Sequence, residues 1–128
     1  MVAYINDTVF DNGLATMKTN ATKININYTQ QATTWTEATS TFICANKTVG
    51  AGSIIPGALA AGATSGRKAT TLAITDGSVT ATQTAGWWSI TDSASILYAA
   101  NSLSATQALT NGNTFTLAAF DITLRGIT

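Results

Sequence analysis

The stretch TAGWWSITD, residues 84–92, places two tryptophans side by side in a run whose composition is typical of a β-strand. Successive side chains of a strand point to opposite faces of its sheet, so Trp87 and Trp88 cannot both enter one core. The fold of this chain must therefore provide cover for a large indole on each side of the same strand.

The apolar residues around this stretch break the alternation that an uninterrupted strand would keep. They have odd numbers before Gly86 and even numbers after it, and they are Val79, Ala81, Trp88 and Ile90. A glycine inside a strand often marks a β-bulge, and one extra residue at Gly86 would align all four on the core face. The pattern predicts that Trp88 is buried and that Trp87 points outward, where either the N-terminal helix or another molecule covers it.

Most of the chain outside this stretch also consists of short runs with β-strand character. They are residues 23–28, 42–49, 67–75, 78–91, 94–104, 106–110 and 113–127. Asp76-Gly77 and Asn111-Gly112 each separate two of these runs, and such pairs predict tight hairpin turns. The regular spacing of runs and turns predicts an all-β fold, an antiparallel β-sandwich or a barrel-like arrangement of strands.

The helical and irregular parts of the chain are few. Residues 7–19 predict one short helix within an N-terminal arm of residues 1–22, because apolar residues recur there at helical spacing. Residues 50–66 are rich in glycine and alanine and predict a long loop. A length of 128 residues, of which 45% are hydrophobic, predicts a single β-rich domain over residues 1–128.

The last strand-like run, residues 113–127, also breaks its alternation midway. A β-bulge near residues 118–119 would place the apolar side chains of both halves on the core face. Asp121 would then face outward, toward Lys68 or Arg125, where we expect an ion pair.

The charge of the chain excludes several classes of partner. Charged residues make up only 9% of the sequence, and six basic residues balance six acidic ones. Such a neutral surface lacks the basic patch that nucleic-acid binding needs, and no apolar run is long enough for a transmembrane helix. The N-terminus also lacks the pattern of a secretory signal peptide. We therefore expect no nucleic acid and no membrane as partner, and we expect part of the uncharged surface to be covered in the working state.

The side chains available for catalysis are few. The sequence has no histidine, which removes the commonest general base and the commonest zinc ligand. Cys44, the only cysteine, lies in a strand-like run and is predicted to be buried and unreactive. The acidic residues are scattered among predicted caps, turns and one strand, so the carboxylate pair of a glycosidase is not indicated. The sequence predicts that the protein is not an enzyme and holds no cofactor and no metal.

Four residues are candidates for contact with a partner protein. Trp87 and Trp35 lie outside the predicted core, and Trp35 belongs to a run predicted to be a polar loop. Aromatic residues are enriched at interfaces. Arg67 and Lys68 are an adjacent basic pair, which indicates either a contact with an acidic partner or a solvated strand start. Alternatively, the two tryptophans together with Tyr98 would suit a sugar-binding site.

Several segments together resemble a family of small structural proteins encoded by tailed bacteriophages and prophages. These segments cover nearly the whole chain, and they are residues 4–26, 28–41, 63–82 and 101–124. The most specific part is GNTFTLAAFDITL, residues 112–124, whereas the runs of Thr and Ala are less specific. Trp87, beside the expected Trp88, departs from the family pattern.

The resemblance implies a virion structural protein, in the first place a capsid decoration (cement) protein that stabilises the head by binding neighbouring capsid subunits. The implied partners are the major capsid protein or other virion proteins, with homo-oligomer formation left open. The implied location is the capsid surface of the virion, after synthesis in the cytoplasm of the bacterial host. The alternatives are a tail or fibre module that contacts the host surface, and a carbohydrate-binding module. The family contributes no catalytic or binding residues that carry over to this chain.

Overall fold

The computed structural model describes residues 7–64 and 66–125, and this part of the chain forms two helices and nine strands. The helices are α1 (Asp7–Asn20) and the π-helical η1 (Glu37–Thr41). The strands are β1 (Lys23–Tyr28), β2 (Ile43–Thr48), β3 (Ala60–Ala61), β4 (Arg67–Thr70), β5 (Ile74–Val79), β6 (Gln83–Thr91), β7 (Leu97–Leu109), β8 (Thr114–Leu117) and β9 (Asp121–Leu124). The start of the predicted N-terminal arm, residues 1–6, and the end of the last predicted run lie outside the described residues.

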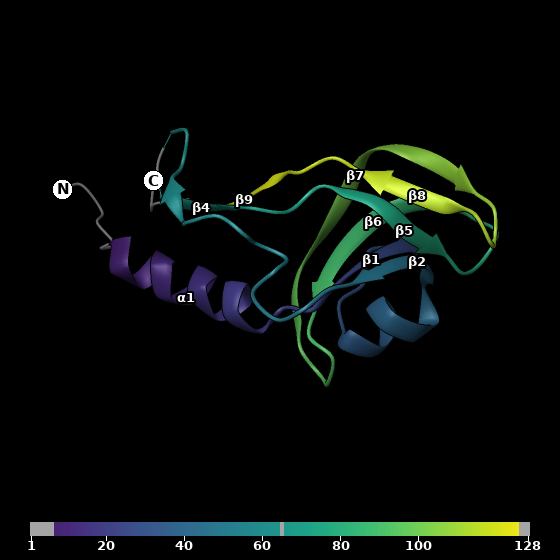
Figure 1. Ribbon diagram of the computed structural model, residues 1–128, viewed down its shortest axis with the longest axis horizontal. Helices are drawn as coiled ribbons and strands as arrows, with labels where there is room; N and C mark the ends of the chain where they lie inside the picture. The colour runs from purple at the N-terminus through teal and green to yellow at the C-terminus, as the bar shows by residue number, and fades with distance from the viewer. Residues whose placement is uncertain (1–6, 65, 126–128) are drawn as a thin grey trace.

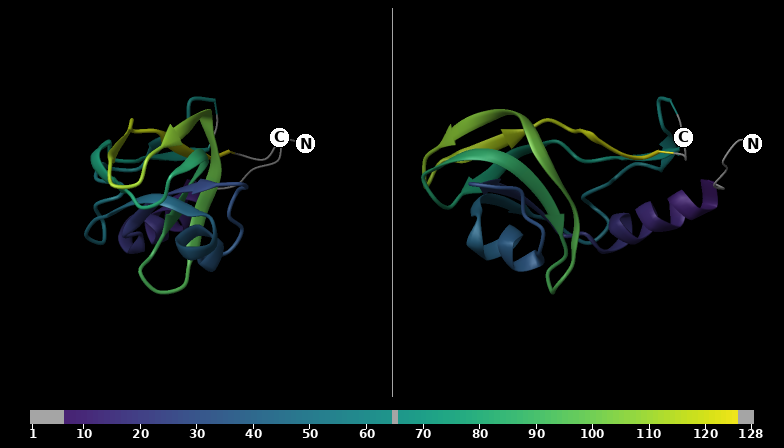
Figure 2. Two further views of the ribbon diagram at one scale, coloured as in Figure 1. Left: turned by 90° about the vertical axis from the view of Figure 1, so that its right-hand side faces the viewer. Right: turned by 180° about the vertical axis from the view of Figure 1, so that it is seen from behind.

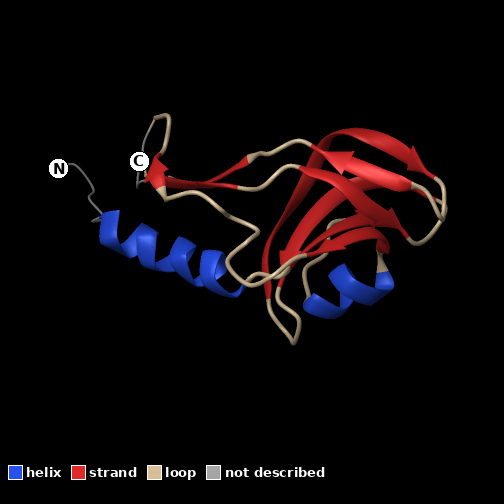
Figure 3. Cartoon of the chain, viewed as in Figure 1, coloured by secondary structure: helices blue, strands red, loops and turns tan. Residues whose placement is uncertain are grey.

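The strands form two antiparallel sheets. Sheet A has the order β7-β6-β1-β2-β5-β8, and sheet B has the order β3-β4-β9. Sheet A curls into a half-barrel, while sheet B and α1 lie together at the opposite end of the molecule (Figure 1 and Figure 2). The predicted all-β, barrel-like fold is confirmed, with strands as the dominant element (Figure 3).

The predicted helix over residues 7–19 is confirmed, and α1 continues one residue further. Leu14 and Met17 on one side of α1 are buried in the same apolar core as Ile24 and Ile90 of sheet A. The helix therefore gains its stability from packing, which a short isolated helix in water lacks.

The segment predicted as a long loop, residues 50–66, contributes two of the most deeply buried side chains. Ile54 and Ile55 are completely buried. Lys18 of α1 holds this segment in place, because its Nζ donates a hydrogen bond of 2.7 Å to the carbonyl oxygen of Ile55. Apart from the short strand β3, the described residues of the segment are irregular, yet part of the segment belongs to the core.

The polar run over residues 30–41 contains a second helical turn that the sequence pattern does not indicate. This turn, η1, lies on the convex face of sheet A (Figure 3). Ala38 is its buried residue, and the Glu37 carboxylate accepts hydrogen bonds from the N–H and the hydroxyl of Thr33 at 2.7 and 2.8 Å. These hydrogen bonds lower the pKa of Glu37. With one buried alanine, the turn has no apolar stripe from which a helix could be predicted.

The convex face of sheet A is covered through polar rather than apolar side chains. Asn27 Nδ2 donates to the carbonyl oxygen of Ala38 in η1 at 2.9 Å, and Asn27 Oδ1 accepts from Ser89 Oγ at 2.8 Å. Asn25 Nδ2 donates to Thr91 Oγ1 at 3.1 Å. The two asparagines and their two hydroxyl partners are fully buried, and these hydrogen bonds replace part of those that water would have made. Asn25 Oδ1 is the exception, since it is buried without a hydrogen-bond partner.

The predicted β-bulge at Gly86 is confirmed. On the side of β1, the register passes from Trp87 to Ala85 without using Gly86. On the side of β7, residues 103–106 all lie opposite Gly86, so this neighbouring strand is irregular at the same point. The strand predicted over residues 78–91 is divided in the structure, because β5 ends at Val79 and β6 begins at Gln83. A bulge bends its strand and increases the twist, which contributes to the curl of sheet A.

The predicted hairpin turn at Asp76-Gly77 is wrong. Both residues lie inside β5, which pairs with β2 and β8 and not with β6. The ring of Phe115 on β8 covers Gly77, and a Cβ at this position would overlap the ring. Asp76 forms an ion pair with Lys47 of β2, at 2.8 Å between Oδ2 and Nζ, and hydrogen bonding to Lys47 lowers the pKa of Asp76. Contacts with the neighbouring strands thus explain why Asp and Gly stand at positions 76 and 77, although the local sequence pattern is that of a turn.

The turn at Asn111-Gly112 is confirmed, but the strands that it joins do not form a hairpin. Gly112 has a φ of +90°, which favours glycine, and its N–H donates to the carbonyl oxygen of Val79 at 3.0 Å. The turn connects β7 to β8, which are the two edge strands of sheet A. The chain therefore turns as predicted and then pairs with β5 instead of with the strand before it.

Two of the predicted strand runs are divided between the two sheets. Residues 67–75 contain β4 of sheet B and the start of β5, and residues 113–127 contain β8 of sheet A and then β9. The two crossings lie side by side, since Thr71 N–H donates to Phe120 O at 2.9 Å and Phe120 N–H donates to Thr71 Oγ1 at 3.1 Å. The predicted β-bulge near residues 118–119 is wrong. The alternation breaks there because the chain passes from β8 of sheet A to β9 of sheet B.

Cys44 is buried, as predicted. Its side chain is fully shielded, and its Sγ lies 3.3 Å from the carbonyl oxygen of Ile26, to which the thiol donates. Burial raises the pKa of Cys44 to about 11, because the thiolate is disfavoured away from water. The thiol is therefore poorly reactive in the folded protein.

Replacing Gly77 by valine should destabilise the protein by about 2–3 kcal/mol, because the new side chain must displace the Phe115 ring. The matched control is Gly57→Val, at an exposed glycine whose Cβ would meet no neighbour within 4 Å. The control should change the free energy of unfolding by less than about 0.5 kcal/mol. Urea unfolding measures both, and equal midpoints for the two variants would contradict the packing of Phe115 on Gly77.

Cys44 should react with a disulfide reagent only after denaturation, and its titration should appear in the pH dependence of stability. The folded pKa lies above the ordinary thiol value, so the folded state keeps its proton longer than the unfolded state. Stability from this group is complete below the ordinary thiol pKa and declines as the pH rises from there toward about 11. Comparing wild type with Cys44→Ala by urea unfolding should show that the variant lacks this part of the decline. Rapid labelling of the native thiol would refute its burial.

Candidate binding surface

The two edge strands of sheet A leave a gap that we call the seam. In the described part of the chain, β7 pairs only with β6 and β8 pairs only with β5, although the turn at residues 110–113 joins β7 to β8. Five successive antiparallel pairs separate them in the sheet, so the two edges run in opposite directions. Their outward N–H and C=O groups face the seam without a strand partner. Unpaired edges of this kind are the surfaces on which another strand can add.

The seam is a groove made of two hollows above an apolar floor. One hollow of about 410 Å³ lies near the turn, between residues 107–110 and residues 113–116. The other, of about 420 Å³, lies between residues 101–104 and residues 116–121. A small cavity of about 60 Å³ beneath them is lined mainly by apolar side chains, which are Ile26, Ala85, Leu103, Leu109, Phe115 and Leu117.

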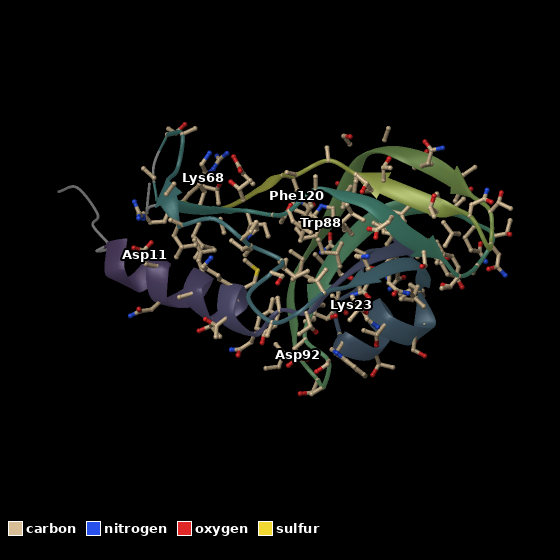
Figure 4. All side chains as sticks on the ribbon, in the orientation of Figure 1. Asp11, Lys23, Lys68, Trp88, Asp92 and Phe120 are labelled. Atoms are coloured by element: carbon tan, nitrogen blue, oxygen red, sulfur yellow. The ribbon has the colours of Figure 1, made fainter. Side chains whose placement is uncertain are left out.

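Trp88 and Phe120 form the aromatic end of the seam. Their ring centroids are 4.5 Å apart with an angle of 45° between the planes, and the two side chains lie together in Figure 4. Trp88 is half-buried and packs against the core cluster from the concave face of sheet A. Both residues also line the larger hollow, so this aromatic pair is accessible from the groove.

The lining of the seam carries one charged residue, and that charge is paired. Asp121 Oδ2 lies 2.9 Å from Lys68 Nζ, and Asp121 Oδ1 accepts a hydrogen bond of 2.5 Å from Thr70 Oγ1. The hydrogen bond from Thr70, and then that from Lys68, lower the pKa of Asp121. The other lining residues of the two larger hollows are uncharged. The seam is thus suited to an uncharged ligand.

The four predicted interface residues line none of the hollows of the seam, and they divide between the two sheets: Trp87 lies in β6 of sheet A and Trp35 in the segment before η1, whereas Arg67 and Lys68 begin β4 of sheet B. Trp87 is half-buried on the convex face opposite Asn27, where η1 is the helix that packs against β6; α1 packs against β4. Trp35 is half-buried as well, and its Nε1 donates to the carbonyl oxygen of Asp92 at 3.2 Å. This hydrogen bond ties the segment before η1 to the turn between β6 and β7.

The basic pair at the start of β4 is engaged in contacts within the chain. Arg67 Nε lies 2.8 Å from Asp11 Oδ1 of α1, and Lys68 pairs with Asp121 on β9 as the sequence suggests. Tyr98 is half-buried and packs against the core, and burial followed by the charge of Asp92 raises its pKa. The side chains considered for a sugar site, Trp35, Trp87 and Tyr98, line none of the three hollows of the seam.

The residues that form the seam were recognisable in the sequence only as strand or core residues. Phe120 and Leu117 were assigned to one core face, and Trp88 to the interior. They face inward as predicted, but the interior is open along one side because β7 and β8 do not pair. The absence of charge along residues 97–109 was the available signal, since exposed edge strands commonly carry charged residues as protection.

Residues 7–64 and 66–125 contain neither a cluster of metal-ligating side chains nor a membrane-spanning helix. No three His, Cys, Asp or Glu side chains of this part of the chain are close enough to hold a metal ion together. Neither described helix has the length and apolar character needed to cross a membrane. No family model matches the chain, and comparison with curated proteins and with solved structures gives no match.

Substitution of the two tryptophans should separate the two faces of β6. Trp88→Ala removes the contact with Phe120 and should cost about 2–3 kcal/mol, less than for a fully buried ring because Trp88 is half-buried. Trp87→Ala should cost about 1 kcal/mol, since Trp87 does not pack against the apolar core. Urea unfolding of each variant measures the difference. A larger loss for Trp87→Ala would contradict the assignment of faces.

Proposed function

We propose that this chain is a structural protein of a bacteriophage particle, of the kind that decorates the capsid by binding neighbouring shell subunits. The observation that carries the proposal is the seam, an uncharged groove between two unpaired strand edges. Such a surface suits attachment to another protein through backbone hydrogen bonds and apolar contact. The resemblance of the sequence to small phage structural proteins is the reason for proposing a phage particle as the place of this attachment.

The way in which charge is used in the molecule supports a role based on contact area. Three ion pairs join charged side chains of the described residues, and they are Lys47–Asp76, Arg67–Asp11 and Lys68–Asp121. The rest of the exposed surface is dominated by threonine, serine, asparagine and alanine. A protein of this type stabilises a shell by mass action, because it binds assembled subunits and not unfolded ones.

The proposal is tested with particles that lack this chain, to which the purified protein is added. We expect saturable binding of hundreds of copies per particle and a rise in the temperature at which the particle releases its DNA. Because the seam is uncharged, the affinity should change by less than about threefold between low and high salt. A handful of copies per particle would favour a tail or fibre part, and no binding would refute the proposal.

A further inference from the structure

We propose that the seam binds an extended, uncharged segment of a different protein chain, which adds as a strand between β7 and β8 and closes sheet A into a barrel. That the partner belongs to a phage particle rests on the function proposed above.

The backbone of the seam favours an extended occupant. Two strand edges of opposite direction face the same groove, and an extended backbone between them can satisfy the hydrogen-bonding groups of both. One of the edge donors is already satisfied locally, because Ser102 N–H donates to its neighbour Asn101 Oδ1 at 2.8 Å. The acceptor in this hydrogen bond is the end of a flexible side chain. A carbonyl oxygen of an incoming strand can take its place and accept from the same N–H.

The side chains of the seam define the chemistry of the occupant. Successive residues of an added strand point alternately into the groove and out to solvent. The inward side chains meet the floor formed by residues such as Leu103 and Leu117, and they meet Trp88 and Phe120 at the aromatic end. A charge placed there would lose its hydration without gaining a partner. The inward residues of the occupant are therefore apolar and uncharged, and the outward ones, which meet solvent, are polar.

A second copy of β7 is a poor occupant of this edge. Residues 103–106 depart from the register of β6 and interrupt the edge of β7 near its middle. An isologous pairing would place this irregular stretch against itself, so neither copy would offer the other a regular edge at that point. The short strand β8, on the other wall, offers only four residues. A flexible segment of another chain can follow both walls, whereas a second folded edge cannot.

The first test uses a peptide and the full chain labelled with nitrogen-15. The probe is an acetylated and amidated heptapeptide of alternating threonine and valine, and the control probe has lysine in place of each valine. We expect the first peptide to shift the amides of residues 107–109 and 114–117 and the Trp88 indole, and the control to leave them unchanged. The proposal is overturned by unshifted amides at millimolar peptide, or by an equal response to the lysine peptide. Concentration-dependent shifts at the same amides without peptide would identify a second copy as the occupant and would also overturn it.

The second test uses a charge placed in the seam. Ser104→Arg introduces a cation at an exposed lining residue, and the matched control Ser40→Arg introduces it at an exposed position of η1. Ser104→Arg should weaken binding to the peptide and to the particle by about tenfold or more, while Ser40→Arg should bind like wild type. Full particle binding by Ser104→Arg would refute the seam as the contact and leave the proposed function standing. Absence of particle binding by wild type would refute the function, and the peptide titration would still decide the seam.

Discussion

One extra residue in β6 shapes the half of the molecule that carries the seam. Gly86 is skipped by the register toward β1, and residues 103–106 of β7 lie opposite it on the other side. Gly86 has no left-handed φ, and a Cβ there would meet only the Thr106 methyl group at 3.9 Å, so the bulge depends on the extra residue and not on a need for glycine. The bend and twist that result contribute to the curl of sheet A, whose edge strands β7 and β8 are joined by a tight turn yet remain unpaired. The seam follows from a sheet that curls almost far enough to close.

The two faces of the central strands β1 and β6 are covered by different physical means. The concave face is apolar, with Ile24 and Ile90 fully buried and with Trp88 at its open side. The convex face carries buried asparagine and hydroxyl side chains, of which Asn27 links β1 to both η1 and Ser89. Asn27 holds η1 against β1 and β6, because both ends of its buried amide are hydrogen-bonded, whereas Asn25 Oδ1 is buried without a partner. This division answers how one strand accommodates two adjacent tryptophans.

The crossing of two strand runs between the sheets couples the seam to the rest of the molecule. Thr71 and Phe120 exchange hydrogen bonds where the chain passes from one sheet to the other. Phe120 also contacts Trp88, and Asp121, the next residue, pairs with Lys68 in sheet B. The aromatic end of the seam is thus held by both sheets. Rigid walls lower the entropy cost of binding, which is an advantage for a protein that would attach through uncharged contacts alone.

The sequence by itself determined the elements whose signals are local. The alternation of residues 23–28, the helix over residues 7–19 and the bulge at Gly86 were predicted from side-chain period and glycine position, and the structure contains all three. The burial of Cys44 was predicted from its place in a strand-like run, where a free cysteine is most often a small buried residue, and the structure confirms it.

Only the tertiary structure decided which strands are neighbours. The pair Asp76-Gly77 has the local signature of a turn, but a strand glycine covered by the ring of Phe115 produces the same two letters. Asn111-Gly112 does turn the chain, yet β8 then pairs with β5. The change of parity near residues 118–119 fits a bulge and a change of sheet equally well. Alternation constrains which face of the sheet a side chain takes, but it does not say which strand lies next to it. The seam exists because β7 and β8 do not pair with each other, and no local pattern states this.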